Sequence, residues 1–175
     1  MADLFPGFDA VTVAGDEWIS SADMAIKAYH WPMLAQPEPV PETLISADPI
    51  WYLEYTLRSW TKGKSLDAFH PDALALCRDA YAQPARLHAM CEGYRAGATC
   101  DRALDAADRG AGRRLSMPVH FLWGAQGFPA QTGDPLGLWR NWSDDVTGTE
   151  LDSGNFGPEE NPDAIVAAVR PFFAD

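Results

Sequence analysis

The sequence predicts an α/β fold in which a block of helices is followed by a strand–helix–strand–helix segment. Residues 20–112 carry a succession of helix signals without a strand pattern. The apolar run 118–123, flanked by turn residues, is typical of a buried parallel strand. Residues 146–151 are compatible with a second strand, and 159–173 have the apolar periodicity of an amphipathic helix. This alternation indicates a doubly wound sheet.

Prolines and capping residues indicate where the helices begin and end. Pro32 is expected to end the first helix, because proline cannot continue a helix without loss of a hydrogen bond. Gly110 and Gly112 are expected to close the helical block. The expected elements are a helix from Ser20 to Trp31, a short helix from Pro41 through Ile45, helices from Pro49 to Gly63 and from Pro71 to Pro84, helices over 87–94 and 99–109, a loop over 124–133 and a helix over 136–142.

The composition limits the classes of function. The chain has 175 residues, is 47% apolar and contains seven Trp and eight Phe, which indicates a globular protein with a sizeable core. A net charge of −12 argues against nucleic-acid and membrane partners. Cys77, Cys91 and Cys100 have no zinc-type spacing, and without a signal peptide they are interpreted as reduced thiols of a cytoplasmic protein. We find no metal cluster, phosphate loop or dinucleotide fingerprint, so we expect no cofactor.

A cluster of hydrogen-bond donors is expected where the first helix ends. Lys27, His30 and Trp31 stand at i, i+3 and i+4, which places them on one face of a helix. An ammonium, an imidazole and an indole N–H are donors, and donors suit an anion. The alternative is a helix end that is packed by a tryptophan and a hydrogen-bonded histidine.

From about Asp9 to the C-terminus, the chain resembles the fluoroacetate (haloacetate) dehalogenases of the α/β-hydrolase superfamily. The segment around His30 is similar to the start of their cap domain, and the segment around Tyr94 is long enough to be specific. The matching stretches are Lys27–Pro37, Ala47–Pro49 with Trp51 and Tyr52, His88–Gly97, Leu122–Gly124 and Ser153–Glu160.

The resemblance implies a partial α/β-hydrolase fold. The family places its nucleophile at a sharp strand-to-helix turn of the form G-x-D-x-G or G-x-S-x-G. The sequence contains no such elbow, and the substrate-binding arginines that follow it in the family are missing too. We therefore expect a truncated hydrolase without the N-terminal core strands. Its expected domains are a remnant of the core over 1–19, a helical cap over 20–112 and a C-terminal α/β core portion over 113–175.

The catalytic residues are assigned through the resemblance. In the family, an aspartate displaces the halide and a histidine activates the water that hydrolyses the resulting ester. Asp9 matches the triad carboxylate, although an ordinary loop aspartate is an equal alternative. Asn155 stands at the position of the base, and its amide cannot accept a proton near neutral pH. Asn155 therefore marks the base without replacing it, and we expect the chain to be inactive alone.

The resemblance also implies a halide pocket. His30, Trp31 and Tyr94 match the His, Trp and Tyr that surround the leaving halide in the family, and Lys27 would add positive potential. An imidazole N–H, an indole N–H and a phenol O–H can all donate to fluoride. The alternative for Tyr94 is a core tyrosine with a hydrogen-bonded hydroxyl. The other histidines have expected structural roles: His70 as a surface cap, His88 on a helix, and His120 in a strand.

Several functions remain open at this stage. The first is hydrolysis of the carbon–halogen bond in a small halogenated carboxylic acid. Others are a non-catalytic helical binding or assembly module that self-associates to cover its sheet edge, and a fragment complemented by an N-terminal half from another chain. Within the enzyme class, an epoxide hydrolase-like fragment is the alternative.

Overall fold

The computed structural model describes residues 26–132 and 134–174. The strand expected near 8–13, most of the helix expected from Ser20, and Asp9 lie outside these ranges. The chain separates into two compact units, Met1–Ile50 with Asp79–Arg113 and Trp51–Arg78 with Arg114–Asp175. The predicted division into core remnant, cap and core stays a prediction.

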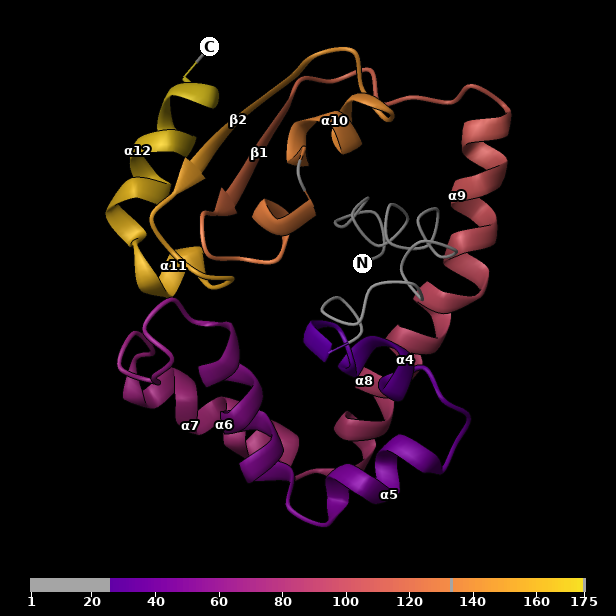
Figure 1. Cartoon of the computed structure of the whole chain (residues 1–175), viewed down its shortest axis with the longest axis vertical. Coiled ribbons are helices and arrows are strands. Elements are labelled where there is room, and N and C mark those ends of the chain that lie inside the picture. Colours follow the sequence, from indigo (N-terminus) through magenta and orange to yellow (C-terminus); the bar gives the residue numbers. More distant parts are fainter. Residues whose placement is uncertain (1–25, 133, 175) are drawn as a thin grey trace. The chain divides into compact units, whose positions relative to one another are not determined.

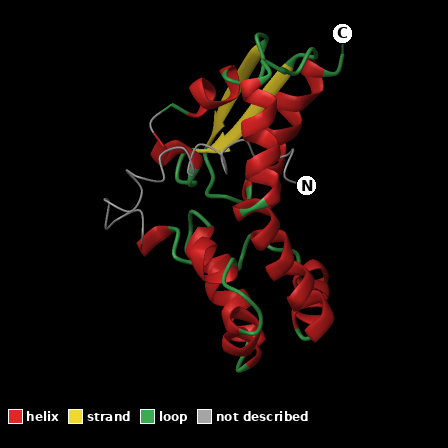
Figure 2. Cartoon of the chain, turned by 90° about the vertical axis from the view of Figure 1, so that its right-hand side faces the viewer, coloured by secondary structure: helices red, strands yellow, loops and turns green. Residues whose placement is uncertain are grey.

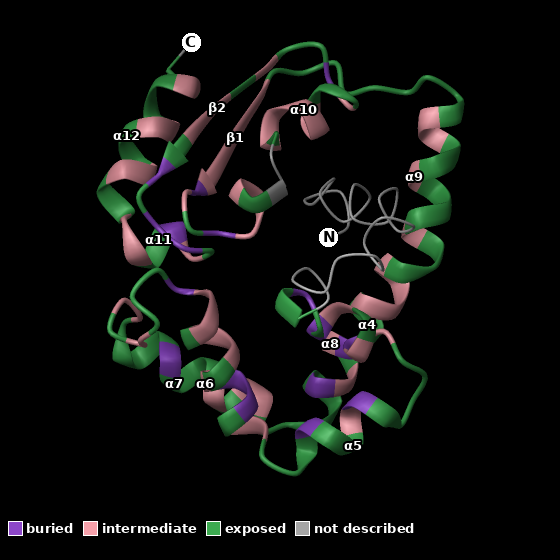
Figure 3. Ribbon diagram, viewed as in Figure 1, coloured by how far each residue is buried: buried purple, intermediate pink, exposed green. Residues whose placement is uncertain are grey.

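The first unit is helical and is organised around its longest helix, α8. The described helices of this unit are α4 (His30–Leu34), α5 (Val40–Ser46), α8 (Pro84–Ala98) and α9 (Cys100–Gly110), and α8 contacts the other three (Figure 1). Its core consists of small and aliphatic side chains that are almost completely buried, namely Ala28, Leu34, Ile45, Leu87 and Cys91 (Figure 3). Gly112 adopts a left-handed conformation, with φ of 67°, as the expected helix stop requires.

The prediction that Pro32 ends a helix is wrong. Pro32 lies inside α4, which starts only at His30. Proline is tolerated there because the N–H groups of a helix's first turn have no intrahelical acceptor, so its missing N–H removes no helical bond. Pro32 thus marks the start of a helix and not its end.

Helices α6 (Pro49–Trp60) and α7 (Pro71–Tyr81) lie mostly in the second unit, and both start at the predicted prolines. The Glu54 carboxylate joins them, accepting from Arg78 on α7 at 2.5 Å and from Arg58 on its own helix at 2.5 Å. His70 has its expected capping role, because its Nδ1 accepts from the Asp72 N–H at 3.2 Å. None of the described helices combines the length and apolarity needed to cross a bilayer.

The two predicted strands are present and pair in parallel. Strand β1 (Val119–Gly124) runs beside β2 (Val146–Leu151) along their full lengths (Figure 2). Phe121 lies 5.5 Å from Trp139 of α10 (Pro135–Arg140), measured between ring centroids. Its neighbour His120 lies 5.5 Å from Phe172 of the last helix. Because successive residues of a strand point to opposite faces, helices cover both faces of this sheet, as the doubly wound prediction requires.

Two expectations for the C-terminal segment need correction. The expected loop over 124–133 contains a 3-10 helix, Pro129–Thr132. The single final helix is two helices, α11 (Gly157–Glu160) and α12 (Pro162–Phe172). They separate at Asn161, whose non-helical backbone and side-chain bond from the Ala164 N–H begin the second helix as an N-cap, with proline following at the first helical position.

Candidate functional site

Three of the predicted site residues lie together in the first unit. The His30 ring lies edge-on to Trp31, with centroids 5.7 Å apart, and edge-on to Tyr94 of α8 at 6.2 Å. His30 is only 5% exposed, and this burial lowers the pKa of its imidazole from 6.5 to about 4. Burial, and then the neighbouring Cys91, raise the pKa of Tyr94. At neutral pH the site therefore offers a neutral imidazole and a protonated phenol, each with a hydrogen to donate.

Lys27 has a different environment from these rings. Its side chain is exposed, whereas His30, three residues later, is buried. A solvated ammonium acts on a buried site only through a screened field. The structure thus brings His30, Trp31 and Tyr94 together and leaves Lys27 at the surface.

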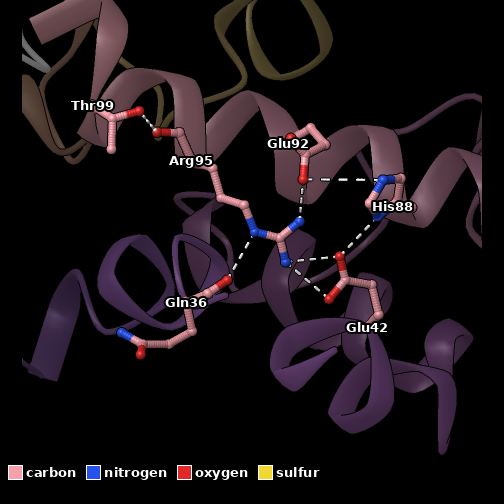
Figure 4. A network of polar contacts seen from close by, with 6 residues as sticks. All are labelled: Gln36, Glu42, His88, Glu92, Arg95 and Thr99. Carbon is pink, nitrogen blue, oxygen red and sulfur yellow. Dashed lines mark hydrogen bonds and ion pairs between the residues drawn. The ribbon is translucent and has the colours of Figure 1, made fainter. Parts of the chain in front are cut away.

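A polar network that the sequence did not predict holds α8 next to Tyr94. Arg95 donates through Nη2 to both carboxylate oxygens of Glu42, at 2.8 and 2.9 Å, and through Nε to the Gln36 carbonyl at 2.8 Å (Figure 4). Its Nη1 donates to Glu92 at 2.5 Å. His88 Nδ1 lies 3.0 Å from Glu42 Oε1. The network fixes α8 to α5 and, through Gln36, to the start of the segment that follows α4.

The network also sets the charge states of its two central groups. Burial acts to raise the pKa of Glu42, but hydrogen bonds from Arg95, from its own backbone and from His88 outweigh it and lower that pKa. Hydrogen bonds to the Glu42 and Glu92 carboxylates raise the pKa of Arg95. The Arg95 side chain is 15% exposed, so this ion pair is largely shielded from water. The sequence contains one indication of this network, because an arginine follows Tyr94 directly within the matching stretch His88–Gly97.

Asn155 lies in the second unit, in the loop that follows β2. Its backbone N–H donates to the Trp60 carbonyl at 2.9 Å, and its Oδ1 accepts from the Phe128 N–H at 2.8 Å. A backbone N–H can only donate, so the atom of Asn155 that faces Phe128 must be the oxygen. The loop after β1, the end of α6 and the loop after β2 therefore meet at residue 155.

Glu160 holds the same loop. Its Oε1 accepts from the Lys62 N–H at 2.5 Å, and its Oε2 accepts from the N–H groups of Gly154 and Phe156 at 2.9 and 3.2 Å. Lys62 also forms an ion pair with Asp152 at 2.5 Å. Gly154 lies so close to the end of α6 that a Cβ on it would stand 2.3 Å from the Trp60 carbonyl oxygen.

Aromatic rings complete the contact between α6 and this loop. The Phe156 ring stacks on Trp60, with centroids 6.3 Å apart, and meets Phe69 edge-on at 5.1 Å. The sequence placed Phe156 and Glu160 in a matching stretch without giving either a role. Their partners Trp60, Lys62 and Phe69 lie about ninety residues earlier in the chain, a separation that local patterns do not reveal.

The predicted site residues thus fall in different parts of the molecule. The ring cluster belongs to the first unit, Asn155 belongs to the second, and Asp9 lies outside the described ranges. Within those ranges, no group of three or more His, Cys, Asp or Glu residues is arranged to hold a metal ion.

Comparison with solved structures defines the class of this fold. A protein from Pseudomonas aeruginosa that is assigned as an epoxide hydrolase matches with a TM-score of 0.82 and 43% identity, over 91% of this chain and 53% of that one. An assigned α/β hydrolase from Nostoc matches with a TM-score of 0.83 and 42% identity, over 88% of this chain and 52% of that one. The chain therefore has part of an α/β-hydrolase fold.

A comparison of sequences identifies a more specific similarity. The chain is 32% identical to a fluoroacetate dehalogenase from Burkholderia sp over 147 residues, which are 84% of this chain and 47% of that enzyme. This confirms the resemblance recognised in the motifs. No protein-family model matches the chain. The chain spans about half the length of the relatives that it matches.

Proposed function

We propose that the chain is the cap and C-terminal core portion of a hydrolase that cleaves the carbon–halogen bond of a small halogenated carboxylic acid such as fluoroacetate. The observation that carries this proposal is the ring cluster of His30, Trp31 and Tyr94. The similarity to a fluoroacetate dehalogenase supports the reaction class.

The ring cluster is suited to a halide that leaves from carbon. Fluoride is strongly hydrated, so its release in a dry site requires donors that replace water. The low pKa of His30, about 4, keeps its ring neutral at pH 7, with one N–H. The Trp31 indole and the Tyr94 phenol supply the other donors, and the network around Arg95 holds the helix that carries Tyr94. Lys27, which is exposed, would add only a screened positive potential.

The second half of the reaction lacks its base in this chain. Hydrolysis of an ester intermediate requires a group that takes a proton from water, and the Asn155 amide cannot do so. Asp9 is the candidate triad acid, which would orient a histidine at position 155. With asparagine there, and with no G-x-D-x-G elbow in the sequence to carry the aspartate that displaces the halide, we propose that the purified chain releases no fluoride from fluoroacetate.

Halide binding tests the ring cluster directly. Titration of the chain with fluoride and chloride should change the tryptophan fluorescence with a saturable dependence, and the Trp31→Phe variant should lose this change. Trp51→Phe is the matched control, because Trp51 is 60% exposed and stacks on Tyr55 at 5.2 Å. A fluorescence response to halide that persists in Trp31→Phe would contradict a halide pocket at the ring cluster. Fluoride release by the unmodified chain that Tyr94→Phe abolishes would overturn the proposed inactivity.

Two observations favour other functions. The similarity to a protein assigned as an epoxide hydrolase favours that substrate class, and epoxide turnover without halide binding would select it. Within the described residues, β1 pairs with β2 alone, and a two-stranded sheet is marginally stable. A further strand from a second copy or from a complementing N-terminal half would extend it, as an assembly module requires. Sedimentation of the purified chain as a monomer would argue against self-association.

A further inference from the structure

We propose that Glu160 is the positioning residue for the side chain at position 155, which it holds against the Phe128 N–H through the backbone on either side. The inference rests on the proposed function only in that residue 155 is taken as the position of the base. The contacts that carry it belong entirely to the second unit.

One carboxylate fixes the backbone on both sides of residue 155. Gly154 and Phe156 immediately precede and follow Asn155, and both donate their N–H groups to Oε2 of Glu160, at 2.9 and 3.2 Å. Hydrogen bonds to an ionised carboxylate are stronger than those between neutral groups. With both neighbours held by one oxygen atom, the direction in which the side chain of residue 155 leaves the backbone is restricted.

The other oxygen of Glu160 ties this loop to the end of α6. Oε1 accepts from the Lys62 N–H at 2.5 Å, and the Asn155 N–H in turn donates to the carbonyl of Trp60 at 2.9 Å. A Cβ on Gly154 would lie 2.6 Å from the Lys62 nitrogen, so the loop and the end of α6 approach closely at this point. Glu160 therefore sets where residue 155 stands relative to α6 as well as how it is oriented.

Phe128 reports whether this positioning reaches the side chain. Its N–H donates to Asn155 Oδ1 at 2.8 Å, whereas the hydrogen bonds of Glu160 go to other residues. A purely local structural role of Glu160 would alter the amides that it binds. A positioning role must also alter the Phe128 amide, through the side chain of residue 155.

The experiment is amide hydrogen exchange by NMR on the 15N-labelled full chain, with Glu160→Gln compared with Glu159→Gln. Glutamine keeps the shape of Glu160 but replaces one acceptor oxygen with a donor, so it cannot serve all of the N–H groups. We expect exchange at Gly154, Phe156 and Phe128 to become about tenfold faster in Glu160→Gln. Glu159 is exposed, so its variant is the matched control and should exchange like the unmodified chain.

Two outcomes would overturn the proposal: an unchanged Phe128 amide when Gly154 and Phe156 exchange faster, or the same acceleration in Glu159→Gln. If Glu160→Gln fails to fold, Glu160→Asp replaces it, because the shorter side chain keeps the carboxylate but draws it back from the amides that it binds. Exchange at Gly154, Phe156 and Phe128 should then become faster together. Faster exchange at Gly154 and Phe156 with an unchanged Phe128 amide would contradict the proposal. Neither readout requires turnover, so an inactive chain leaves both decisive.

Discussion

The two units hold their candidate site residues by different means. In the first unit, side chains do so: the His30 ring is enclosed by other rings, and the Arg95 guanidinium binds Glu42 through both carboxylate oxygens. In the second unit, the backbone does so: Asn155 is fixed by main-chain groups of Trp60 and Phe128. Glu160 adds a side-chain contribution, by accepting hydrogen bonds from the residues on either side of Asn155.

This difference determines which substitutions matter in each unit. Desolvation controls the first site, because burial alone accounts for the lowered pKa of His30. The second site depends on the close approach of two main-chain segments, because there is no space for a side chain at Gly154. The first site should therefore respond to pH, and the second should respond to added volume.

The largest effect is expected from Gly154→Ala. The new methyl group would lie 2.3 Å from the Trp60 carbonyl oxygen and 2.6 Å from the Lys62 nitrogen, both backbone atoms that cannot move independently. We expect a loss of about 3 kcal/mol in the free energy of unfolding, measured with urea. Gly93→Ala is the control, since a Cβ there has no neighbour within 4 Å and the residue lies in α8.

The control should move in the opposite direction, gaining about 0.5–1 kcal/mol, because alanine is the better residue in the interior of a helix. Equal effects of the two substitutions would show that the contact between α6 and the loop after β2 does not exist in solution. That outcome would also remove the basis for a backbone-held position 155.

A second effect, which is absent at neutral pH and grows only as the pH falls, is expected from His30→Gln. The folded-state pKa of His30, about 4, is below its ordinary value of 6.5, so the unfolded chain binds a proton more readily. The contribution of neutral His30 to the free energy of unfolding is fully present above pH 6.5 and is lost as the pH falls towards 4. The loss approaches about 3 kcal/mol below pH 4, at about 1.4 kcal/mol for each unit of pKa difference.

Urea unfolding between pH 7 and pH 4 measures this effect. The unmodified chain should lose stability more steeply than His30→Gln as the pH falls, since glutamine does not titrate. His70→Gln is the control, because the His70 side chain is 73% exposed, and it should follow the unmodified chain. Parallel curves for all three proteins would mean that His30 is solvated and that the ring cluster is open to water.

The elements with strong local signals were predictable from the sequence. Pro49 and Pro71 begin their helices as expected, and the strand predicted at 146–151 has those bounds in the structure. The prediction at Pro32 failed because proline is compatible with both a helix end and a first turn. Local sequence patterns do not distinguish these cases; the hydrogen bonds of the following residues do.

The sequence predicted residues of the candidate sites but not the hydrogen bonds that hold them in place. The family motif identified Tyr94 and Asn155, because each lies within a specific stretch of sequence. Two of the bonds that support them, Arg95 to Glu42 and Glu160 to Lys62, join residues 53 and 98 positions apart. Such pairs depend on packing between distant segments, which periodicity and capping signals do not specify.

The smallest effect on stability, close to zero, is expected from Asn155→His, which tests whether the lost base alone accounts for inactivity. The Phe128 N–H, 2.8 Å from Asn155 Oδ1, requires an acceptor at that place. A histidine there would turn an unprotonated ring nitrogen towards Phe128 and carry its proton on the other nitrogen, which then cannot accept one from water. Because the sequence also lacks the elbow that would carry the displacing aspartate, we expect no fluoride release from this variant. Long-range 1H–15N NMR spectra report the tautomer, and the opposite tautomer together with fluoride release would show that histidine alone restores the base.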